Sequence, residues 1–293
     1  MLRRLYLTIL LLMIPALVQA GERDERFGLR DIRKNPRSLY RINASSSWTP
    51  ASPDADGVSM SHWWSAQNTC YQDSAKTTVA ASDGDVVGHP NDYYDATSGV
   101  SQPTTDNKPT LQVAEVNGKR AWRLDGSNDY WRGPFATISQ PYTVYLVAKL
   151  DGTVINNNTY YVATNGYEAG HSCTLFKETS TDPDKFAINT ETGAEDTQMG
   201  ANADGNWHLW IVEISDATTA TFWLDGVQQA TSAAVTTSTL SGIVIGAFTD
   251  LSFPWKGDIA EVAIRTGGAS STAKNQWGSY AQKTYGISQT TIP

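Results

Sequence analysis

Hydrophobic and polar residues alternate along much of this chain with the period of β-strands. In residues 141–150, PYTVYLVAKL, every second side chain falls on one side, which is the spacing of an inward strand face. The side chains on that face are those of Tyr142, Val144, Leu146 and Ala148. Residues 207–215, WHLWIVEIS, are apolar on both sides, as expected for a strand deep inside a sandwich. Further strands are expected at 121–126, 219–224, 241–248 and 257–264.

Turn and helix signals complete this pattern. Asp225-Gly226 predicts a tight hairpin, because both central positions of such a turn require a positive φ. Only residues 272–285 have helical spacing, and Gly286 is placed as the C-terminal cap. No solenoid or propeller repeat is present. The sequence therefore predicts an all-β fold, an antiparallel two-sheet jelly-roll sandwich with a short C-terminal helix.

The N-terminus has the features of a secretory signal peptide over residues 1–20. Arg3 and Arg4 precede the apolar run LYLTILLLMIPALV, and Val18-Gln19-Ala20 supplies small residues for cleavage. The apolar run is shorter than the ~20 residues that a membrane span requires, and no later segment is long enough. We therefore expect export to the periplasm or the extracellular space, with no transmembrane segment in the mature chain.

Charge is distributed unevenly after the signal peptide. Residues 21–43 hold seven Lys and Arg against four acids, whereas residues 44–293 hold 13 Lys and Arg against 26 acids. An acidic body argues against nucleic acid as a partner. The basic stretch and the Ser- and Pro-rich segment 45–57 together predict a leader and linker over 21–57. This leader is either a solvated tether or a contact to envelope or virion proteins.

Several fragments occur in an order typical of one known group of domains. They are SHWWSAQNTCYQDSAKTT, DGDVVG, KPTLQ, NGKRAWRLDGSNDYW, DGNWHLWIVEIS, ATFWLDG, IVIGAF, WKGDIAEVAI and YAQKTYGI. Together they resemble the LamG-like, concanavalin A-like jelly-roll domains of bacterial exported proteins and phage virion proteins, over residues 58–287 with a tail at 288–293. The resemblance implies a twisted jelly roll with a concave face, commonly with a ligand-binding role. It does not identify the ligand.

The strand KGDIAEVAIR raises the question of catalysis, because Asp258 and Glu261 lie in it. A separation of three residues places them on opposite faces of a regular strand, about 10 Å apart along it. A retaining glycosidase needs its two carboxyl groups ~5–5.5 Å apart. The laminarinase-type enzymes of this superfold resemble E-x-D-x-x-E or E-x-D-x-E, and that pattern is absent here. We therefore expect a protein that is not an enzyme.

Other catalytic patterns are also missing from the sequence. There is no G-x-S-x-G motif, and the histidines at 62, 89, 171 and 208 have no spacing typical of a zinc or Ser-His site. His208 follows Trp207 at a strand start, which favours a structural role.

Calcium is the cofactor that the sequence permits. Hard cations bind carboxylates and carbonyls on turns, and related LamG-like domains often bind calcium near the sandwich rim. The candidate ligands are Asp83, Asp85, Asp125 and Asp129. Asp-Gly is also ordinary turn chemistry, so both interpretations stay open. Cys70 and Cys173 are either one long-range disulfide or two small buried side chains.

A carbohydrate surface combines aromatic rings with amide and carboxylate hydrogen bonds. The candidates with this chemistry are Asn157, Tyr160, Tyr161, Asn165, Tyr167, Tyr130, Trp131 and Trp255. The alternative is that these rings pack in the core or at its rim. The hypothesis that follows is an exported, non-catalytic module that binds glycans or glycoconjugates. A structural protein of a surface or virion assembly is the alternative, and a polysaccharide-degrading enzyme is the third.

Overall fold

The computed structural model describes most of the region that the sequence assigns to the domain. The described residues are 48–152, 159–164, 173–178, 185–189, 197–202, 204–215, 219–232, 239–248 and 251–293. The predicted signal peptide and residues 21–47 of the predicted leader lie outside them.

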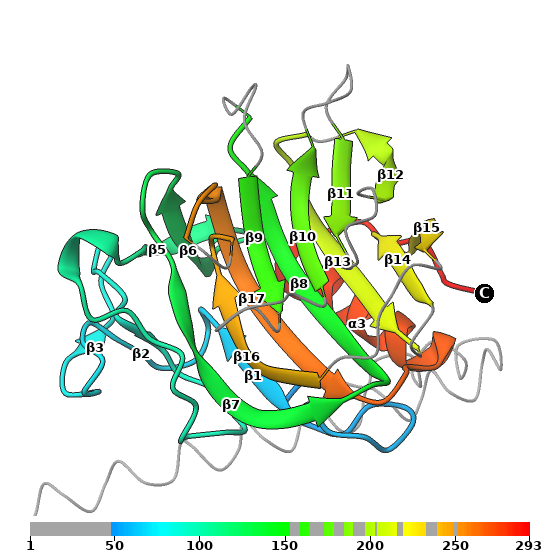
Figure 1. Ribbon diagram of the computed structural model, residues 1–293, viewed down its shortest axis with the longest axis horizontal. Helices are drawn as coiled ribbons and strands as arrows, with labels where there is room; N and C mark the ends of the chain where they lie inside the picture. Colours follow the sequence, from blue (N-terminus) through cyan, green and yellow to red (C-terminus); the bar gives the residue numbers. More distant parts are fainter. Residues whose placement is uncertain are drawn as a thin grey trace, which may run out of the picture. The chain divides into compact units, whose positions relative to one another are not determined.

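The large sheet has the strand order β15-β14-β13-β8-β17-β6-β5, and β1 also pairs with β17 (Figure 1). Its strands are β1 (His62–Ser65), β5 (Thr110–Val116), β6 (Lys119–Asp125), β8 (Tyr142–Leu150), β13 (Trp207–Ile214), β14 (Ala220–Leu224), β15 (Val227–Ser232) and β17 (Lys256–Thr266). Neighbouring strands are antiparallel. The long strand β17 pairs with β6 through its first half and with β1 through its second half.

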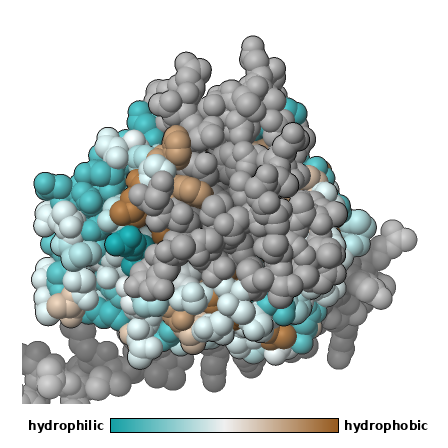
Figure 2. Space-filling view, in the orientation of Figure 1, coloured by the Kyte–Doolittle hydropathy of each residue, from teal (hydrophilic) through white to brown (hydrophobic). Residues whose placement is uncertain are grey.

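The second sheet has the order β12-β11-β10-β9-β16-β7 and is also antiparallel. Its strands are β7 (Trp131–Ser139), β9 (Thr159–Thr164), β10 (Cys173–Glu178), β11 (Lys185–Asn189), β12 (Thr197–Asn202) and β16 (Thr239–Ile245). A small sheet pairs β2 (Cys70–Tyr71) with β3 (Val79–Ala80) and β4 (His89–Pro90), and the 3₁₀ turn η1 covers Thr105–Asn107. In the view of Figure 2 the described surface over β2, β3 and β5 is largely hydrophilic.

The large sheet is buried on both faces, which explains its apolar strands. On β8, the alternate residues Tyr142, Val144, Leu146 and Ala148 pack into the core shared with the second sheet, as predicted. Tyr145 and Val147 point to the opposite face, where they join a second hydrophobic cluster with helix α3 (Ser271–Tyr285). The strand 207–214 divides in the same way between the two clusters. The predicted all-β, antiparallel two-sheet sandwich is therefore confirmed.

Helix α3 begins and ends as its sequence predicts. The hydroxyl of Ser270 accepts a hydrogen bond from the backbone N–H of Ala273, which caps the first turn. Gly286 ends the helix with φ of 76°, a left-handed conformation that glycine adopts without strain. Trp277 stacks on Tyr145 with ring centroids 4.4 Å apart, so the helix is fixed to the large sheet. The hairpin turn at Asp225-Gly226 is confirmed by φ values of 51° and 81°.

The segments 48–57 and 288–293, predicted as the end of the linker and as a tail, lie in the compact unit Trp48–Pro293. Asp54 is buried and accepts a hydrogen bond from Nε of Arg265 on β17. At the other end, the N–H of Thr290 donates to the carbonyl of Asp225 over 2.8 Å, and Ile292 is buried. The composition of residues 45–57 is typical of a linker, and the sequence gives no local sign that this segment is folded. Asp54 and Asp56 bind Arg265, which lies more than 200 residues further along the chain.

Among the described residues, no helix combines the length and the hydropathy needed to cross a membrane.

Candidate functional site

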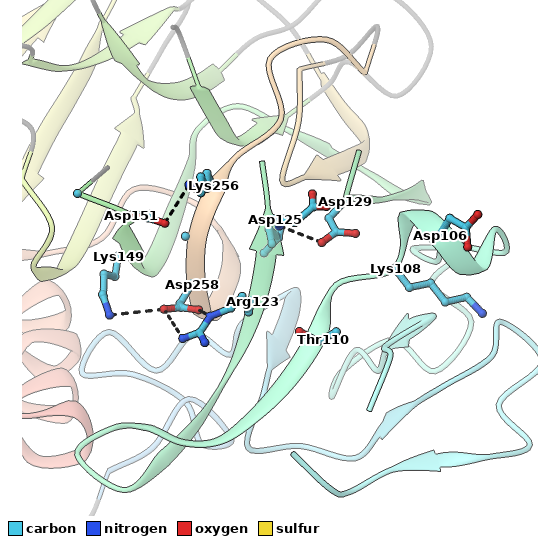
Figure 3. Close-up of a pocket in the computed structure, with 13 residues that line it drawn as sticks. Asp106, Lys108, Thr110, Arg123, Asp125, Asp129, Lys149, Asp151, Lys256 and Asp258 are labelled. Carbon is cyan, nitrogen blue, oxygen red and sulfur yellow. Dashed lines mark hydrogen bonds and ion pairs between the residues drawn. The ribbon is translucent and has the colours of Figure 1, made fainter. Parts of the chain in front are cut away.

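A hollow of about 740 Å³ lies where β5, β6, β8 and β17 carry charged side chains (Figure 3). We call it the charged hollow. It is lined by Asp106, Lys108, Thr110, Arg123, Leu124, Asp125, Asp129, Lys149, Asp151, Gly152, Lys256, Gly257 and Asp258. Figure 3 shows Lys149, Asp258 and Arg123 at one end, Asp106 and Lys108 at the other, and Asp125 and Asp129 between them.

The pairing of β6, β17 and β8 places Arg123, Asp258 and Lys149 beside one another. Asp258 on β17 pairs with Arg123 on β6 and with Lys149 on β8. Directly opposed residues of antiparallel strands project from the same face, so all three side chains share one side of the large sheet. This is the side on which α3 packs, because Val147 and Ala260 on the same strands belong to the cluster around that helix.

Arg123, Lys149 and Asp258 form one network with Glu115, which lies beside the hollow's lining on β5. Asp258 receives Nε of Arg123 at 2.8 Å and lies 3.6 Å from Nζ of Lys149. Glu115 on β5 pairs with the same two cations, at 2.7 Å and 3.1 Å. Although burial opposes it, hydrogen bonding to Lys149 and the charge of Arg123 lower the pKa of Glu115. Because each cation bridges two carboxylates, the network holds its donors and acceptors in fixed positions.

Two aspartates in the middle of the hollow differ in environment. Asp125 is exposed, and its Oδ1 accepts the N–H of Ser127 at 2.7 Å. Asp129 is 6% exposed, and its Oδ2 accepts the N–H of Asp125 at 3.0 Å. Burial, with the added charge of Asp125, raises the pKa of Asp129 to about 6. Asp129 is therefore a carboxyl group that gains a proton just below neutral pH.

The prediction that Asp258 and Glu261 project from opposite faces is wrong. The pairing between β17 and β8 shifts register between Ile259 and Glu261, so that Ile259 faces Ala148 and Glu261 faces Val147. One extra residue in a strand is a β-bulge, and it reverses the alternation beyond it. Asp258, opposite Lys149, and Glu261, opposite Val147, therefore lie on the same face.

Sharing a face does not make these two carboxylates a catalytic pair. Glu261 is completely buried beneath α3, and its Oε1 accepts hydroxyl hydrogen bonds from Ser65 at 3.0 Å and Tyr280 at 2.6 Å. Tyr285 donates a third, at 2.5 Å. Burial raises the pKa of Glu261 to about 7, against the effect of these three donors. We call Glu261, Ser65, Tyr280 and Tyr285 the Glu261 cluster; it fastens α3 to the sheet, away from solvent.

The candidate calcium ligands belong to two turns, one with Asp83 and Asp85 and one with Asp125 and Asp129. Asp83 accepts the N–H of Val113, and Asp85 accepts the N–H groups of Ala81 and Ser82 at 2.9 Å each. Asp125 and Asp129 lie in the charged hollow instead. Within the described ranges, no three His, Cys, Asp or Glu side chains are grouped to hold a metal ion. Each of the four carboxylates accepts at least one backbone N–H, and calcium at either turn stays a prediction.

Two of the predicted sugar-binding rings are core residues. Trp131 is completely buried, and its Nε1 donates to the carbonyl of Val87 at 2.7 Å. Trp255 is 1% exposed and belongs to the same core. Their position beside turns suggested exposure, but both rings point inward. Tyr130 is half-buried and lines a second hollow. Asn157, Asn165 and Tyr167 lie outside the described residues, as do the side chains of Tyr160 and Tyr161.

The cysteine and histidine predictions have simpler outcomes. Cys70 is a buried free thiol, and the side chain of Cys173 lies outside the described residues. The Nδ1 of His208 lies 2.6 Å from Asp225 and its Nε2 lies 2.8 Å from Asp204. Although burial opposes it, these hydrogen bonds raise the pKa of His208. It braces the hairpin turn at Asp225, which is a structural role.

Residues that the sequence predictions missed make up much of the charged hollow. Arg123, Lys149 and Lys256 lie on strands that were predicted, or beside them. A signal was present, since Arg123 alternates with the inward Trp122 and Leu124, and Lys149 with Ala148 and Leu150. What was missing was the strand order that places Arg123 and Lys149 on either side of Asp258.

No protein-family model and no curated protein sequence matches the chain. Solved structures do. Domain 4 of AbnA, a GH43 extracellular arabinanase from Geobacillus stearothermophilus solved in complex with arabinotriose, superposes with a TM-score of 0.51 and 14% identity, over 78% of this chain and 98% of that domain. A Trypanosoma rangeli sialidase in complex with the inhibitor DANA gives a TM-score of 0.53 and 13% identity, over 88% of this chain and 39% of the sialidase. At these identities the likeness shows the fold alone, a two-sheet β-sandwich.

Proposed function

We propose that this protein is an exported, non-catalytic carbohydrate-binding module that holds a sugar chain in the charged hollow. The observation that carries the proposal is the hollow itself, in which fixed cations and carboxylates alternate on neighbouring strands (Figure 3). The similar fold of the arabinanase domain, solved with arabinotriose, supports the choice of ligand class.

The chemistry of the hollow suits sugar hydroxyl groups. Each hydroxyl both donates and accepts a hydrogen bond, so it is matched by neighbouring ammonium or guanidinium donors and carboxylate acceptors. Since ion pairs already hold Arg123, Lys149 and Asp258 in place, little side-chain entropy is lost on binding. Four cations and five carboxylates line the hollow, which leaves it close to neutral. We therefore propose a neutral rather than a strongly charged saccharide for this site.

The burial of Glu261 and the ion pairing of Asp258, the two carboxylates of β17, favour binding over hydrolysis. Glu261 has no access to a substrate, because it is completely buried. Asp258 is held by Arg123 through two hydrogen bonds, at 2.8 Å and 3.3 Å. Neither is placed to act as an acid or a nucleophile across a glycosidic bond.

Hydrolysis remains the second candidate because of Asp129. A carboxyl group with a pKa near 6 beside a second carboxylate is how glycosidases separate an acid from a base. In that case Asp129 would donate the proton to the leaving oxygen, and Asp125 would be the partner.

A glycan array with the full-length mature protein tests the proposal. We expect binding of a neutral oligosaccharide that weakens at least tenfold in Lys256→Gln and in Asp125→Asn. Lys119→Gln is the matched control, because Lys119 is an exposed cation on β6 that does not line the hollow. Failure to bind any saccharide, or equal binding by all variants, would overturn the proposal. Release of reducing ends that Asp129→Asn abolishes would instead establish hydrolysis.

The assembly hypothesis has no comparable support. It rests on the predicted leader, of which residues 21–47 lie outside the described residues.

A further inference from the structure

A second, smaller hollow of about 350 Å³ lies beside the start of β7, and we call it the Tyr130 hollow. It is lined by Gly99, Ser101, Gln102, Pro103, Thr104, Tyr130, Arg132, Gly133 and Pro134. Its volume is at the lower end of ligand pockets, which are ~300–1,000 Å³. A hollow of this size suits a single small ring.

The wall of this hollow is built closely from backbone. A Cβ added to Gly133 would lie 2.2 Å from the carbonyl oxygen of Gly99, so no larger residue fits there without a shift. The backbones of Ser101 and Arg132 exchange hydrogen bonds of 3.0 Å and 3.3 Å. Such a wall fixes the backbone of Arg132, so its side chain starts from a defined place rather than from a free loop.

The buried amide of Gln102 fixes the opposite side. Its Nε2 donates to the carbonyl of Tyr130 at 3.3 Å, and its Oε1 accepts the N–H of Thr104 at 3.0 Å. Tyr130 also packs against buried Val244 and Ala247. Tyr130 is therefore held through its backbone carbonyl and by packing against Val244 and Ala247, and it also lines the hollow.

The Tyr130 hollow differs in charge from the protein as a whole. The protein has a net charge of −8, yet no carboxylate lines the Tyr130 hollow. Arg132 is exposed, and within the described part of the chain its guanidinium forms no ion pair or hydrogen bond. An unpaired guanidinium offers two parallel N–H donors to a carboxylate, and an aromatic ring offers a flat apolar surface beside it.

We propose that the Tyr130 hollow binds an acidic sugar residue, with the sugar carboxylate on Arg132 and the ring face against Tyr130. The inference rests on the proposed function, since it names a second subsite of a saccharide-binding module. Asp129 lines the charged hollow and Tyr130 lines this one, so the two sites adjoin along the chain. A glycan with both neutral and acidic residues would use both.

Calorimetry with defined oligosaccharides tests this subsite on the full-length mature protein. The probes are a panel of uronate-containing trisaccharides, trigalacturonate among them, and the same compounds with methyl-esterified carboxylates. We expect at least one acid form to bind, its ester to bind at least tenfold more weakly, and Arg132→Gln to remove that difference. Tyr130→Phe should retain binding and Tyr130→Ala should lose it. Sodium acetate as a competitor shows whether the sugar ring contributes.

The controls separate this inference from the proposed function. Lys119→Gln removes one exposed positive charge elsewhere and should leave the acid-to-ester ratio within twofold of the wild type. Equal binding of acid and ester, equal competition by acetate, or no effect of Arg132→Gln would each overturn the subsite. Neutral oligosaccharides that still bind through Lys256 would then leave the proposed function standing. Loss of all saccharide binding would overturn both.

Discussion

Asp258 and Glu261 are two carboxylates on one strand and one face, yet they have different surroundings. Asp258 lines the charged hollow and is paired with Arg123, whose side chain is 46% exposed, and with Lys149. Glu261 lies beneath α3 among three hydroxyl groups, and its second oxygen has no hydrogen-bond partner in the described chain.

The difference shows that the covering layer, rather than the strand, sets the role of each carboxylate. Asp258 is also buried, and burial raises its pKa, but the cations Arg123 and Lys149 balance its negative charge. Hydroxyl groups offer hydrogen bonds but no charge, so burial prevails and raises the pKa of Glu261 to about 7. The first arrangement keeps a polar surface available to a ligand, and the second joins a helix to a sheet.

The largest expected effect comes from removing Glu261. Glu261→Ala leaves the hydroxyls of Ser65, Tyr280 and Tyr285 without their acceptor and opens a cavity beneath α3. We expect the free energy of unfolding to fall by about 3–5 kcal/mol, since each buried unsatisfied group costs ~1–3 kcal/mol. Urea denaturation at pH 5 measures it. A loss below 1 kcal/mol would show that the cluster does not fasten the helix.

The pH dependence of stability is the next largest effect. The pKa of Glu261 is about 7 in the folded chain against 4.5 as its ordinary value, so the folded state binds the proton more tightly. Stability should therefore be greatest below pH 4.5 with respect to this group, fall as the pH rises towards 7, and level off above it. The loss should be on the order of 3 kcal/mol.

Glu261→Gln isolates this contribution, because Asp129, Asp258 and His208 also have raised pKa values. The difference in unfolding free energy between wild type and Glu261→Gln should change by about that amount from pH 5 to pH 8. Parallel curves for the two proteins would contradict the assignment.

The surroundings of Asp258 and Glu261 could not be predicted from the sequence, whereas features set by local residues could. The positions of β6, β8, β13, β14, β16 and β17, the Asp225-Gly226 turn and the capped helix were predictable, because each depends on residues close together in the chain. The double-sided burial of 207–214 was predictable too, since both faces are apolar.

The bulge in β17 was not predictable from the letters KGDIAEVAIR. Strand periodicity assumes a regular ladder, and the register shift at Ala260 arises where β17 leaves β6 and meets β1. The predicted exposure of Trp131 and Trp255 was wrong for a related reason, because the side on which a ring projects depends on the neighbouring sheet. The charged hollow required the strand order, which local pattern does not contain.

A smaller loss of stability is expected at the other carboxylate. Asp258→Asn removes one negative charge, but Glu115 still pairs with Arg123 and Lys149. We expect the unfolding free energy to fall by about 1–2 kcal/mol, less than half the effect of Glu261→Ala. Urea denaturation of the two variants under one buffer measures the comparison. Equal losses would mean that the hollow is as tightly built as the helix interface.

The smallest expected effect is the salt dependence of stability, which should differ between the charged hollow and the Glu261 cluster. Arg123→Gln should cost about 0.5–1 kcal/mol at low ionic strength, because an ion pair with a half-exposed partner contributes little. That cost should shrink in about 0.5 M NaCl, since screening acts strongly on pairs in contact with water. Tyr285→Phe is the matched test in the Glu261 cluster, where both groups are buried, and its cost should not change with salt. If both costs fell together, solvent would reach beneath α3, and Glu261 would have to be considered with Asp258 as an accessible pair.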